Sequence, residues 1–398
     1  SEDLPALCKR AERFGATSSI IADAKPAMFQ TVVPQAIGLA ATYEGQYRLG
    51  TALARPFIAA EQVRRAKQLG GATLVHGATG KGNDQVRFEF AYRSLAPQCP
   101  VLAPWKTWDF RGRQDLVDYL RSQGCDEDFS VTQEFSLDEN LWHLSVEGGP
   151  LEDPEAHVDI ESILAAVADR FGGGAAHGSA GGGPMPPTVE VSFTRGAPTA
   201  LDGEETELST IVSRLNQRYR HAPWAWDLVL ENRFTGIKSR GVYINPAAKL
   251  LQLCADALAR CRFNKPMYDQ YVELGKQYGT ILYRGEYFSD QRQAVDAAAR
   301  FVLAALTGKV TVHLEPVPYV ARIEAEQAIF QRELATFEES EYQHSHAEGF
   351  ISLSWLSSIG RPFAEDSHED LVEAGSAAAS GVRRPEQLHG GRLVPSSV

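Results

Sequence analysis

The chain has 398 residues, a mass of 43.6 kDa and a formal net charge of −12, from 39 lysines and arginines against 51 aspartates and glutamates. A chain of this length holds two or three domains with sizeable cores, which excludes a peptide or a disulfide-stapled mini-protein. The excess of acids repels a phosphate backbone, so we expect no nucleic-acid partner.

Neither a membrane nor an oxidising compartment is expected. The longest apolar stretch, Ala297 to Leu306, contains Arg300 and falls short of the roughly 20 residues that span a bilayer. The five cysteines are odd in number and never form a C-x-x-C pair, which favours a reducing compartment without a cysteine zinc site. Because no apolar leader follows Ser1, we expect no export signal and a cytoplasmic protein.

The first 125 residues alternate between helical and strand patterns, which predicts an α/β nucleotide-binding domain with a doubly wound parallel sheet. A sheet of this kind normally opens with a strand and its ligand-bearing loop, whereas this chain opens on a helix. We therefore expect a domain that is incomplete at its N-terminus, by truncation or by real loss. In chain order the predicted elements are a helix over Leu4 to Phe14, a strand over Thr17 to Ala22, a helix over Phe57 to Leu69, a strand over Ala72 to His76, a helix over Gln85 to Leu95, a strand over Val101 to Ala103 and a helix over Asp115 to Ser122.

From residue 126 the regular alternation of helical and strand patterns ends, and residues 126–356 are predicted to form a second, α+β domain. Gly172 to Pro187 is of low complexity and reads as a mobile loop, and residues 357–398 form a tail that we expect to be partly disordered. Within the domain the patterns predict a strand over Thr188 to Phe193, helices over Leu208 to Tyr219, Ala247 to Arg260, Pro266 to Tyr278 and Gln291 to Leu306, and a strand over Lys309 to Leu314.

The most informative segment is Ala72 to Phe88, in which a buried strand, a glycine-rich turn and a helix follow one another. Glycines let backbone amides approach an anion, while the helix N-terminus and Lys81 add positive charge. The segment is not a Walker A loop, because Gly82 stands where that motif needs a hydroxyl. From the glycines alone, an ordinary strand-to-helix turn remains the alternative.

Five strings occur in order along the chain, and together they resemble the argininosuccinate synthase family from residue 1 to about Leu356. The strings are Tyr47 to Pro56, His76 to Phe88, Asp138 to Ser145, Leu151 to Pro154 and Glu231 to Tyr243. The resemblance implies an adenine nucleotide alpha hydrolase-like domain followed by a synthetase and multimerisation domain. It also implies a homotetramer whose C-terminal segment reaches a neighbouring subunit.

By that resemblance the protein is a ligase of arginine biosynthesis and the urea cycle, with citrulline, aspartate and ATP as substrates. The ureido oxygen of citrulline would attack the α-phosphorus and release pyrophosphate, and the aspartate amine would then displace AMP. We expect Mg²⁺ on the departing pyrophosphate, held mostly by phosphate oxygens and water. We assign no side chain as a metal ligand.

The resemblance also assigns the site residue by residue. Asp84 and Arg87 would be catalytic through positioning rather than proton transfer. The citrulline site would comprise Tyr47, Asn83, Arg87, Ser136, Ser145, Glu231 and Tyr243. Thr79, Asn83 and Asp84 would hold aspartate. ATP would contact His76, Gly77, Ala78, Thr79, Gly80, Lys81, Gly82 and Asn83.

Three departures from the family pattern keep alternatives open. The pyrophosphate-binding string Ser-Gly-Gly-x-Asp-Ser is absent from these 398 residues. The family favours a glycine-rich run where this chain has Ala222 to Asp227, and Glu-x-Pro-Gly where it has Ile244 to Ala247. A paralogue with a changed amino-acid substrate and a non-catalytic binding protein are therefore alternative hypotheses.

Overall fold

The computed structural model describes residues 3–80, 82–125, 135–171, 187–338 and 340–358. The chain divides into two compact units, Ser1–Phe330 and Gln331–Val398. Every predicted site residue falls in the first unit, so the description centres there.

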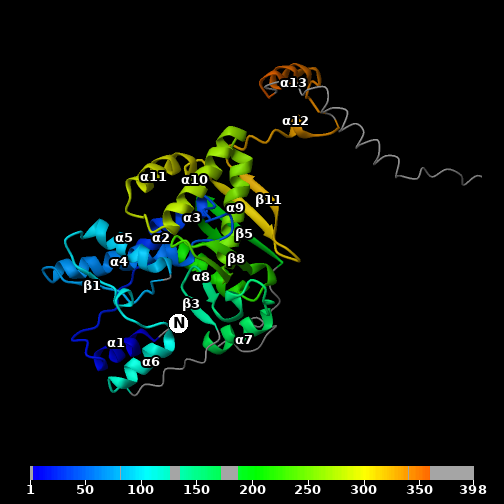
Figure 1. Cartoon of the computed structure of the whole chain (residues 1–398). Helices are drawn as coiled ribbons and strands as arrows, with labels where there is room; N and C mark the ends of the chain where they lie inside the picture. The colour runs from blue at the N-terminus through cyan, green and yellow to red at the C-terminus, as the bar shows by residue number, and fades with distance from the viewer. Residues whose placement is uncertain (1–2, 81, 126–134, 172–186, 339, 359–398) are drawn as a thin grey trace, which may run out of the picture. The chain divides into compact units, whose positions relative to one another are not determined.

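Helices and short strands alternate in the N-terminal part of the first unit (Figure 1). Strands β1 and β2 pair in parallel, with Leu74 opposite Val101, as the α/β pattern predicts. The elements are α1 (Leu4–Arg13), α2 (Lys25–Gln30), α3 (Val32–Gly38), α4 (Gly50–Gln68), β1 (Leu74–Val75), α5 (Asn83–Leu95), β2 (Val101–Leu102), the 3₁₀ turn Pro104–Lys106 and α6 (Arg113–Ser122).

Two N-terminal predictions need correction. The strand predicted over Thr17 to Ala22 does not form. Among the described residues, no strand pairs with this β-branched run, and Ile20 and Ile21 are more than half exposed. Helix α4 begins at Gly50, seven residues before the predicted start, and continues through Pro56 in its interior. A proline normally ends a helix at the residue before it, which is why the sequence predicted a later start.

A small core holds α4, α5 and β1 together. Apolar side chains recur along one face of α4, among them Ala59 and Val63, and pack against Tyr92 of α5 and Leu74 of β1. This packing sets α4 and α5 side by side, and their N-terminal turns carry one part of the candidate site.

The second part of the unit contains an antiparallel four-stranded sheet of order β3-β4-β9-β8. Its register sets Ser145 of β4 opposite Tyr243 of β9, and Glu231 of β8 opposite Ser239 of β9. The strands are β3 (Ser136–Glu139), β4 (Leu144–Glu147), β8 (Trp226–Asn232) and β9 (Lys238–Ile244).

A second antiparallel sheet, of order β11-β10-β5-β6-β7, packs with the remaining helices around the main hydrophobic core. Its strands are β5 (Thr188–Thr194), β6 (Ala197–Leu201), β7 (Glu204–Glu205), β10 (Gly308–His313) and β11 (Tyr319–Ala325). The helices are α7 (Ile160–Phe171), α8 (Leu208–Tyr219), α9 (Pro246–Arg262), α10 (Lys265–Tyr283) and α11 (Asp290–Leu303), with 3₁₀ turns at Gly149–Glu152 and Pro223–Ala225. The predicted α+β character of this half is confirmed.

The second unit contains α12 (Arg332–Ala335) and α13 (Ser345–Ser358). The segment 172–186 and the tail from residue 359 lie outside the described residues, so their predicted mobility stays a prediction. Among the helices that the structure describes, none combines the length and apolarity that crossing a bilayer requires.

Candidate active site

The N-terminal turn of α5 supplies the central residues of the site. Gly82 caps the helix in an extended conformation, and Asp84 lies in the first turn, where a negative charge is favoured. Arg87 follows one turn later, and its Nη1 donates to Asp84 Oδ1 at 3.0 Å. The Arg87 Nε donates to the backbone carbonyl of Tyr283 at 3.0 Å, so the guanidinium is held from two sides.

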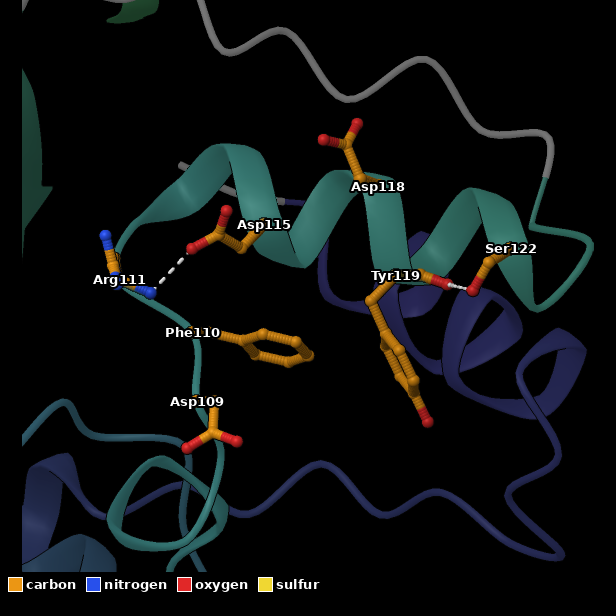
Figure 2. A pocket seen from close by; sticks show the side chains of 7 residues that line it. All are labelled: Asp109, Phe110, Arg111, Asp115, Asp118, Tyr119 and Ser122. Atoms are coloured by element: carbon orange, nitrogen blue, oxygen red, sulfur yellow. Dashed lines mark hydrogen bonds between the residues drawn. The ribbon is translucent and has the colours of Figure 1, made fainter.

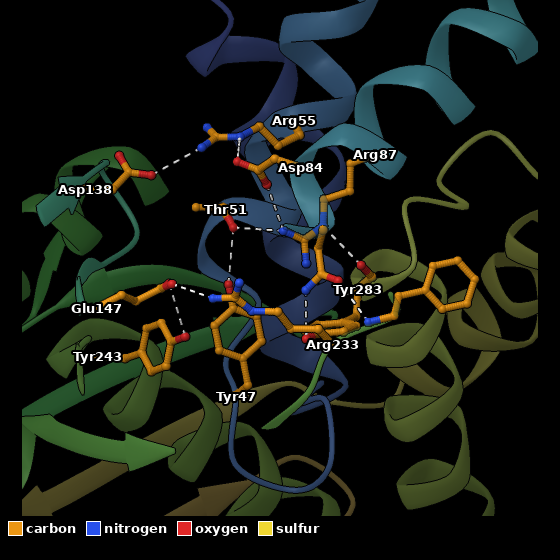
Figure 3. Close-up of polar contacts among 12 residues, drawn as sticks. Tyr47, Thr51, Arg55, Asp84, Arg87, Asp138, Glu147, Arg233, Tyr243 and Tyr283 are labelled. Atoms are coloured by element: carbon orange, nitrogen blue, oxygen red, sulfur yellow. Dashed lines mark hydrogen bonds and ion pairs between the residues drawn. The ribbon is translucent and has the colours of Figure 1, made fainter. Parts of the chain in front are cut away.

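The N-terminal turns of α4 add two residues that the sequence analysis did not single out. Arg55 Nε donates to Asp84 Oδ2 at 2.8 Å, and its Nη2 donates to Asp138 of β3 at 3.2 Å. One turn earlier, Thr51 Oγ1 accepts a 3.0 Å hydrogen bond from Arg87 Nη1. Figure 3 shows this chain of polar contacts running from Asp138 through Arg55 and Asp84 to Arg87 and Thr51.

Strands of the four-stranded sheet contribute a second polar group. Arg233, just after β8, donates from Nη2 to Glu147 Oε2 at 2.7 Å and to Ser239 Oγ at 2.8 Å. The hydroxyl of Tyr243 lies 3.5 Å from the other oxygen of Glu147. Glu147 therefore orients Tyr243, a residue that the resemblance assigns to citrulline, although Glu147 itself was not predicted.

Tyrosine rings gather between these polar groups. Tyr47 packs edge-on against Tyr243 and Tyr283, with ring centroids 4.9 and 5.7 Å apart. The guanidinium of Arg87 lies 5.1 Å from the Tyr283 ring centroid, a cation–π distance. The hydroxyls of Tyr47 and Thr51 are 3.4 Å apart. Three of the residues predicted from widely separated strings, Tyr47, Arg87 and Tyr243, thus meet in one cluster.

The two predicted carboxylates of the cluster are in different electrostatic environments. Burial alone would raise the pKa of Asp84, but Arg55 and Arg87 outweigh burial and lower it below its ordinary value. Burial, reinforced by the nearby Glu147, raises the pKa of Glu231 to about 7. Oε2 of Glu231 is buried and has no hydrogen-bond partner among the described residues. Near pH 7 the site therefore offers one ionised carboxylate and one that readily gains or loses a proton.

Both polar atoms of the Asn83 side chain form hydrogen bonds within the protein. Its Nδ2 donates to the Tyr283 hydroxyl at 2.8 Å, and its Oδ1 accepts from the backbone N–H of Phe234 at 2.8 Å. Both ends of the side-chain amide are therefore engaged in joining α5, α10 and the β8–β9 turn. The second N–H of the amide and the second lone pair of its oxygen are not used by these bonds, so the predicted contacts of Asn83 with the substrates stay a prediction.

The predicted nucleotide loop lies between β1 and α5. His76 is buried and accepts a hydrogen bond at Nδ1 from the backbone N–H of Ala78 at 3.2 Å, while its Nε2 lies 3.4 Å from Glu89 Oε1. Glu89 is also paired with Lys106. His76 thus fixes the start of the turn. A side chain added at Gly77 would meet no atom within 4 Å, so the space beside that backbone is open to a phosphate.

The other predicted residues are spread around the cluster. Thr79 and Gly80 are exposed, and Lys81 lies outside the described residues. Ser145 is buried, and its hydroxyl lies 3.4 Å from the backbone carbonyl of Asp138. Ser136 is exposed at the start of β3, opposite Glu147. Both serines therefore lie on the strands that border the cluster.

Trp224 and Trp226 lie in the segment Ala222 to Asp227, which departs from the family pattern, and they pack against the hydrophobic core. Trp226 Nε1 donates to the backbone carbonyl of Arg220 at 3.2 Å, and Trp224 packs against Tyr219 with ring centroids 5.5 Å apart. Both rings are partly buried against the main core. The substitution of Ala222 to Asp227 for the family's glycine-rich run thus places packing residues next to β8.

A separate pocket of about 580 Å³ lies along α6 and the loop before it, away from every predicted site residue (Figure 2). Its lining includes Asp109, Asp115 and Asp118, which would repel a nucleotide or an acidic substrate. Among the residues that the structure describes, no three His, Cys, Asp or Glu side chains gather as a metal site would require.

Comparisons with known proteins cover nearly the whole of the described chain. Residues 1–126 match the argininosuccinate synthase N-terminal HUP domain, and residues 135–359 match the C-terminal domain of the same family. The argininosuccinate synthase of Endomicrobium trichonymphae is 35% identical over 355 residues, which cover 88% of this chain and 83% of the relative. That of Cronobacter sakazakii is 35% identical over 371 residues, covering 92% of this chain and 88% of the relative.

Proposed function

Because the chain belongs to the argininosuccinate synthase family, it is an ATP-dependent ligase that joins citrulline to aspartate. We propose that both amino acids bind at the cluster formed by Asp84, Arg87, Glu231 and Tyr243 with their neighbours. The observation that carries the proposal is the convergence of Asp84, Arg87, Glu231 and Tyr243 from separate elements. The alternatives with a changed substrate or no catalysis are not favoured.

The charges of the cluster suit two zwitterionic substrates. Each amino acid brings an ammonium group that needs an acid and a carboxylate that needs a cation or amide. We assign Asp84 and Thr79 to aspartate, because Asp84 stays ionised beside two guanidiniums. We assign Tyr47, Ser145, Glu231 and Tyr243 to citrulline, with Ser136 and Arg87 at its edge. Asn83 contributes by holding α5 in place.

The reaction that these residues serve has two displacements. The ureido oxygen of citrulline forms a bond to the α-phosphorus of ATP, and the bond to pyrophosphate breaks. The aspartate amine, having lost a proton, then attacks the ureido carbon, and AMP leaves with the original ureido oxygen. Both steps gain chiefly from orientation and neutralised charge, worth about 7 to 11 kcal/mol in well-oriented cases.

We propose that the loop from His76 to Gly82 holds the phosphates of ATP, because open space beside Gly77 and the start of α5 form an anion cradle there. Among the residues that the structure describes, the side chains around this loop do not form a metal site by themselves. We therefore propose that Mg²⁺ arrives bound to the phosphates, and we route no step through a protein-bound metal.

An oxygen-transfer experiment tests the proposal. Incubation of the protein with ATP, Mg²⁺, aspartate and citrulline labelled with ¹⁸O in the ureido group should yield AMP that carries one ¹⁸O, as read by mass spectrometry. Asp84→Ala and Arg87→Ala should abolish turnover while circular dichroism stays unchanged. Asp118→Ala, an exposed acid of α6, is the matched control and should retain activity. Unlabelled AMP, or full activity of either site variant, would contradict the proposal.

Two further assignments are proposals as well. Helix α13 exposes several large apolar side chains, which supports an oligomer and, from the family, a homotetramer; they are Phe350, Ile351, Leu353, Trp355 and Leu356. Light scattering should give four chains per particle, and Leu353→Glu together with Leu356→Glu should lower that number. We also propose a cytoplasmic location, because the five cysteines are all free.

A further inference from the structure

A second pocket, of about 510 Å³, lies between α11, the β5–β6 hairpin and the junction of α2 and α3. It contains none of the residues assigned to the ligase site. Three arginines from two elements line it: Arg292 and Arg300 from α11, and Arg195 from the hairpin turn. Arg292, Asp296 and Arg300 are spaced four residues apart, so they share one face of α11.

The lining is positively charged in an acidic protein. The three guanidiniums and the single carboxylate, Asp296, give the pocket a formal charge of +2, whereas the chain carries −12. Arg292 pairs with Asp296 and stacks over Tyr287, 4.4 Å from the ring centroid. Among the described residues, neither Arg195 nor Arg300 has a side-chain hydrogen bond or an ion pair within 4 Å. Arg300 still interacts electrostatically with Asp296, so Arg195 is the guanidinium of this pocket without an acidic partner, and the lining keeps its net positive charge.

Neutral groups add hydrogen-bonding capacity beside these charges. The Oε1 atom of Gln35 accepts a 2.7 Å hydrogen bond from the Tyr278 hydroxyl, so the amide NH₂ group of Gln35 remains as a donor. Nε of Arg292 and Oδ1 of Asp296 are both buried and without a partner among the described residues, so the pocket also holds one open acceptor. An oxyanion bridging Arg195 and Arg300 would satisfy donors that the fold itself leaves open, and charge-assisted hydrogen bonds of this kind are the strong ones.

We propose that this pocket binds a small metabolite with at least two negative charges carried on oxygen, apart from the ligase site. Arginine is suited to such a ligand because its planar donors match both carboxylates and phosphates. The shared chemistry admits a phosphate or a dicarboxylate, and the experiment separates the two. The inference does not depend on the ligase reaction, because binding is measured without turnover.

Calorimetric titration of the whole protein at low ionic strength tests this, with sodium phosphate and disodium succinate as separate probes. The ligase site is first occupied by aspartate, citrulline and the non-reacting analogue α,β-methylene-ATP, so that the probes report on the second pocket. The variant R195Q/R300Q removes two of the three positive charges that line the pocket, and both residues are outside the ligase machinery. The control R260Q/R322Q removes two exposed arginines elsewhere, each already paired with an acid. Both variants change the net charge equally.

We expect saturable binding of at least one probe to the wild type and the control, and at least tenfold weaker binding to R195Q/R300Q. The probe that binds identifies the ligand as a phosphate or a dicarboxylate. No saturable binding of either probe overturns the proposal. Binding that R195Q/R300Q leaves unchanged, or that both variants weaken equally, overturns it too, since the ions would then bind elsewhere or through net charge alone.

Discussion

Arg55 and Asp84 are 29 residues apart in the chain, yet their side chains meet at 2.8 Å, Nε to Oδ2, and join the starts of α4 and α5. Arg55 also reaches Asp138 of β3. This one guanidinium therefore links the nucleotide-binding part of the chain to the four-stranded sheet. It also fixes the orientation of the Asp84 carboxylate, whose other oxygen accepts from Arg87.

Replacing Arg55 by Gln should raise the pKa of Asp84, because Arg55 is the stronger of the two cations that lower it. The acidic limb of the pH profile of kcat/KM for aspartate should then move to higher pH. Losing a charge-assisted hydrogen bond of about 1.5 to 3 kcal/mol should lower kcat/KM at pH 7 by about 10- to 100-fold. Arg64→Gln, on the exposed face of the same helix, is the control and should leave the profile unchanged. An unshifted acidic limb in the Arg55 variant would rule out this coupling.

Glu231 should limit stability at alkaline pH. Its pKa is raised to about 7 in the folded chain from an ordinary value of 4.5, so the folded state favours the protonated form. This contribution is complete below pH 4.5 and is lost as the pH rises through 7. Glu231→Gln, which mimics the protonated form, should therefore leave stability unchanged at pH 4.5 and increase it by up to about 3 kcal/mol at pH 8.

Urea denaturation at the two pH values measures this difference. Glu273→Gln, on the exposed surface of α10, should show no such dependence on pH. Equal stabilisation of the Glu231 variant at both pH values would show that Glu231 titrates normally.

Citrulline binding should release protons. An ammonium group beside Glu231 stabilises its ionised form, so the part of the Glu231 population that is protonated near pH 7 must give up its proton. Calorimetry in buffers of different ionisation enthalpy should show release of about half a proton per site at pH 7. Release should vanish at pH 9 and in Glu231→Gln. Proton uptake, or release that persists in that variant, would move the ammonium group of citrulline to another acid.

Gly285 should be intolerant of a side chain for two separate reasons. Its φ of +79° costs any other residue about 1 to 2 kcal/mol, and an added Cβ would lie 2.7 Å from the Arg87 Cα. Gly203 has a φ of +82° with nothing within 4 Å, so Gly203→Ala isolates the backbone cost. Gly285→Ala should be at least about 1 kcal/mol less stable than Gly203→Ala in thermal unfolding. It should also lose activity, because α5 must shift. Equal stabilities would mean that the contact with Arg87 relaxes freely.

The long periodic helices and the strand–loop–helix of residues 72–88 could be predicted from sequence because each carries its signal locally. The start of α4 could not. Proline usually breaks a helix, so a helix that continues through Pro56 was not expected. Thr51 and Arg55 lie on the same face of α4 only because the helix begins at Gly50, and for this reason they were not predicted as site residues. A threonine and an arginine four residues apart, just before the proline, were the available signal.

The contacts between the site residues and their partners could not be predicted from the sequence either. Glu147 and Arg233 are 86 positions apart and meet only because β4, β9 and β8 pair in one register. The strand predicted over Thr17 to Ala22 failed for a related reason: β-branched residues favour a strand only where a neighbour exists to pair with them. Strand pairing is a long-range property that short patterns do not contain.

The double anchoring of Asn83 has a consequence for enzymologists who scan this site by mutation. Its amide joins the end of the loop His76 to Gly82 to both α10 and the β8–β9 turn by hydrogen bonds. Asn83→Ala would therefore make the proposed binding sites of all three substrates less rigid at once. A loss of activity in such a variant would combine lost substrate contacts with lost rigidity of the site. Hydrogen exchange of the empty enzyme would separate the two effects.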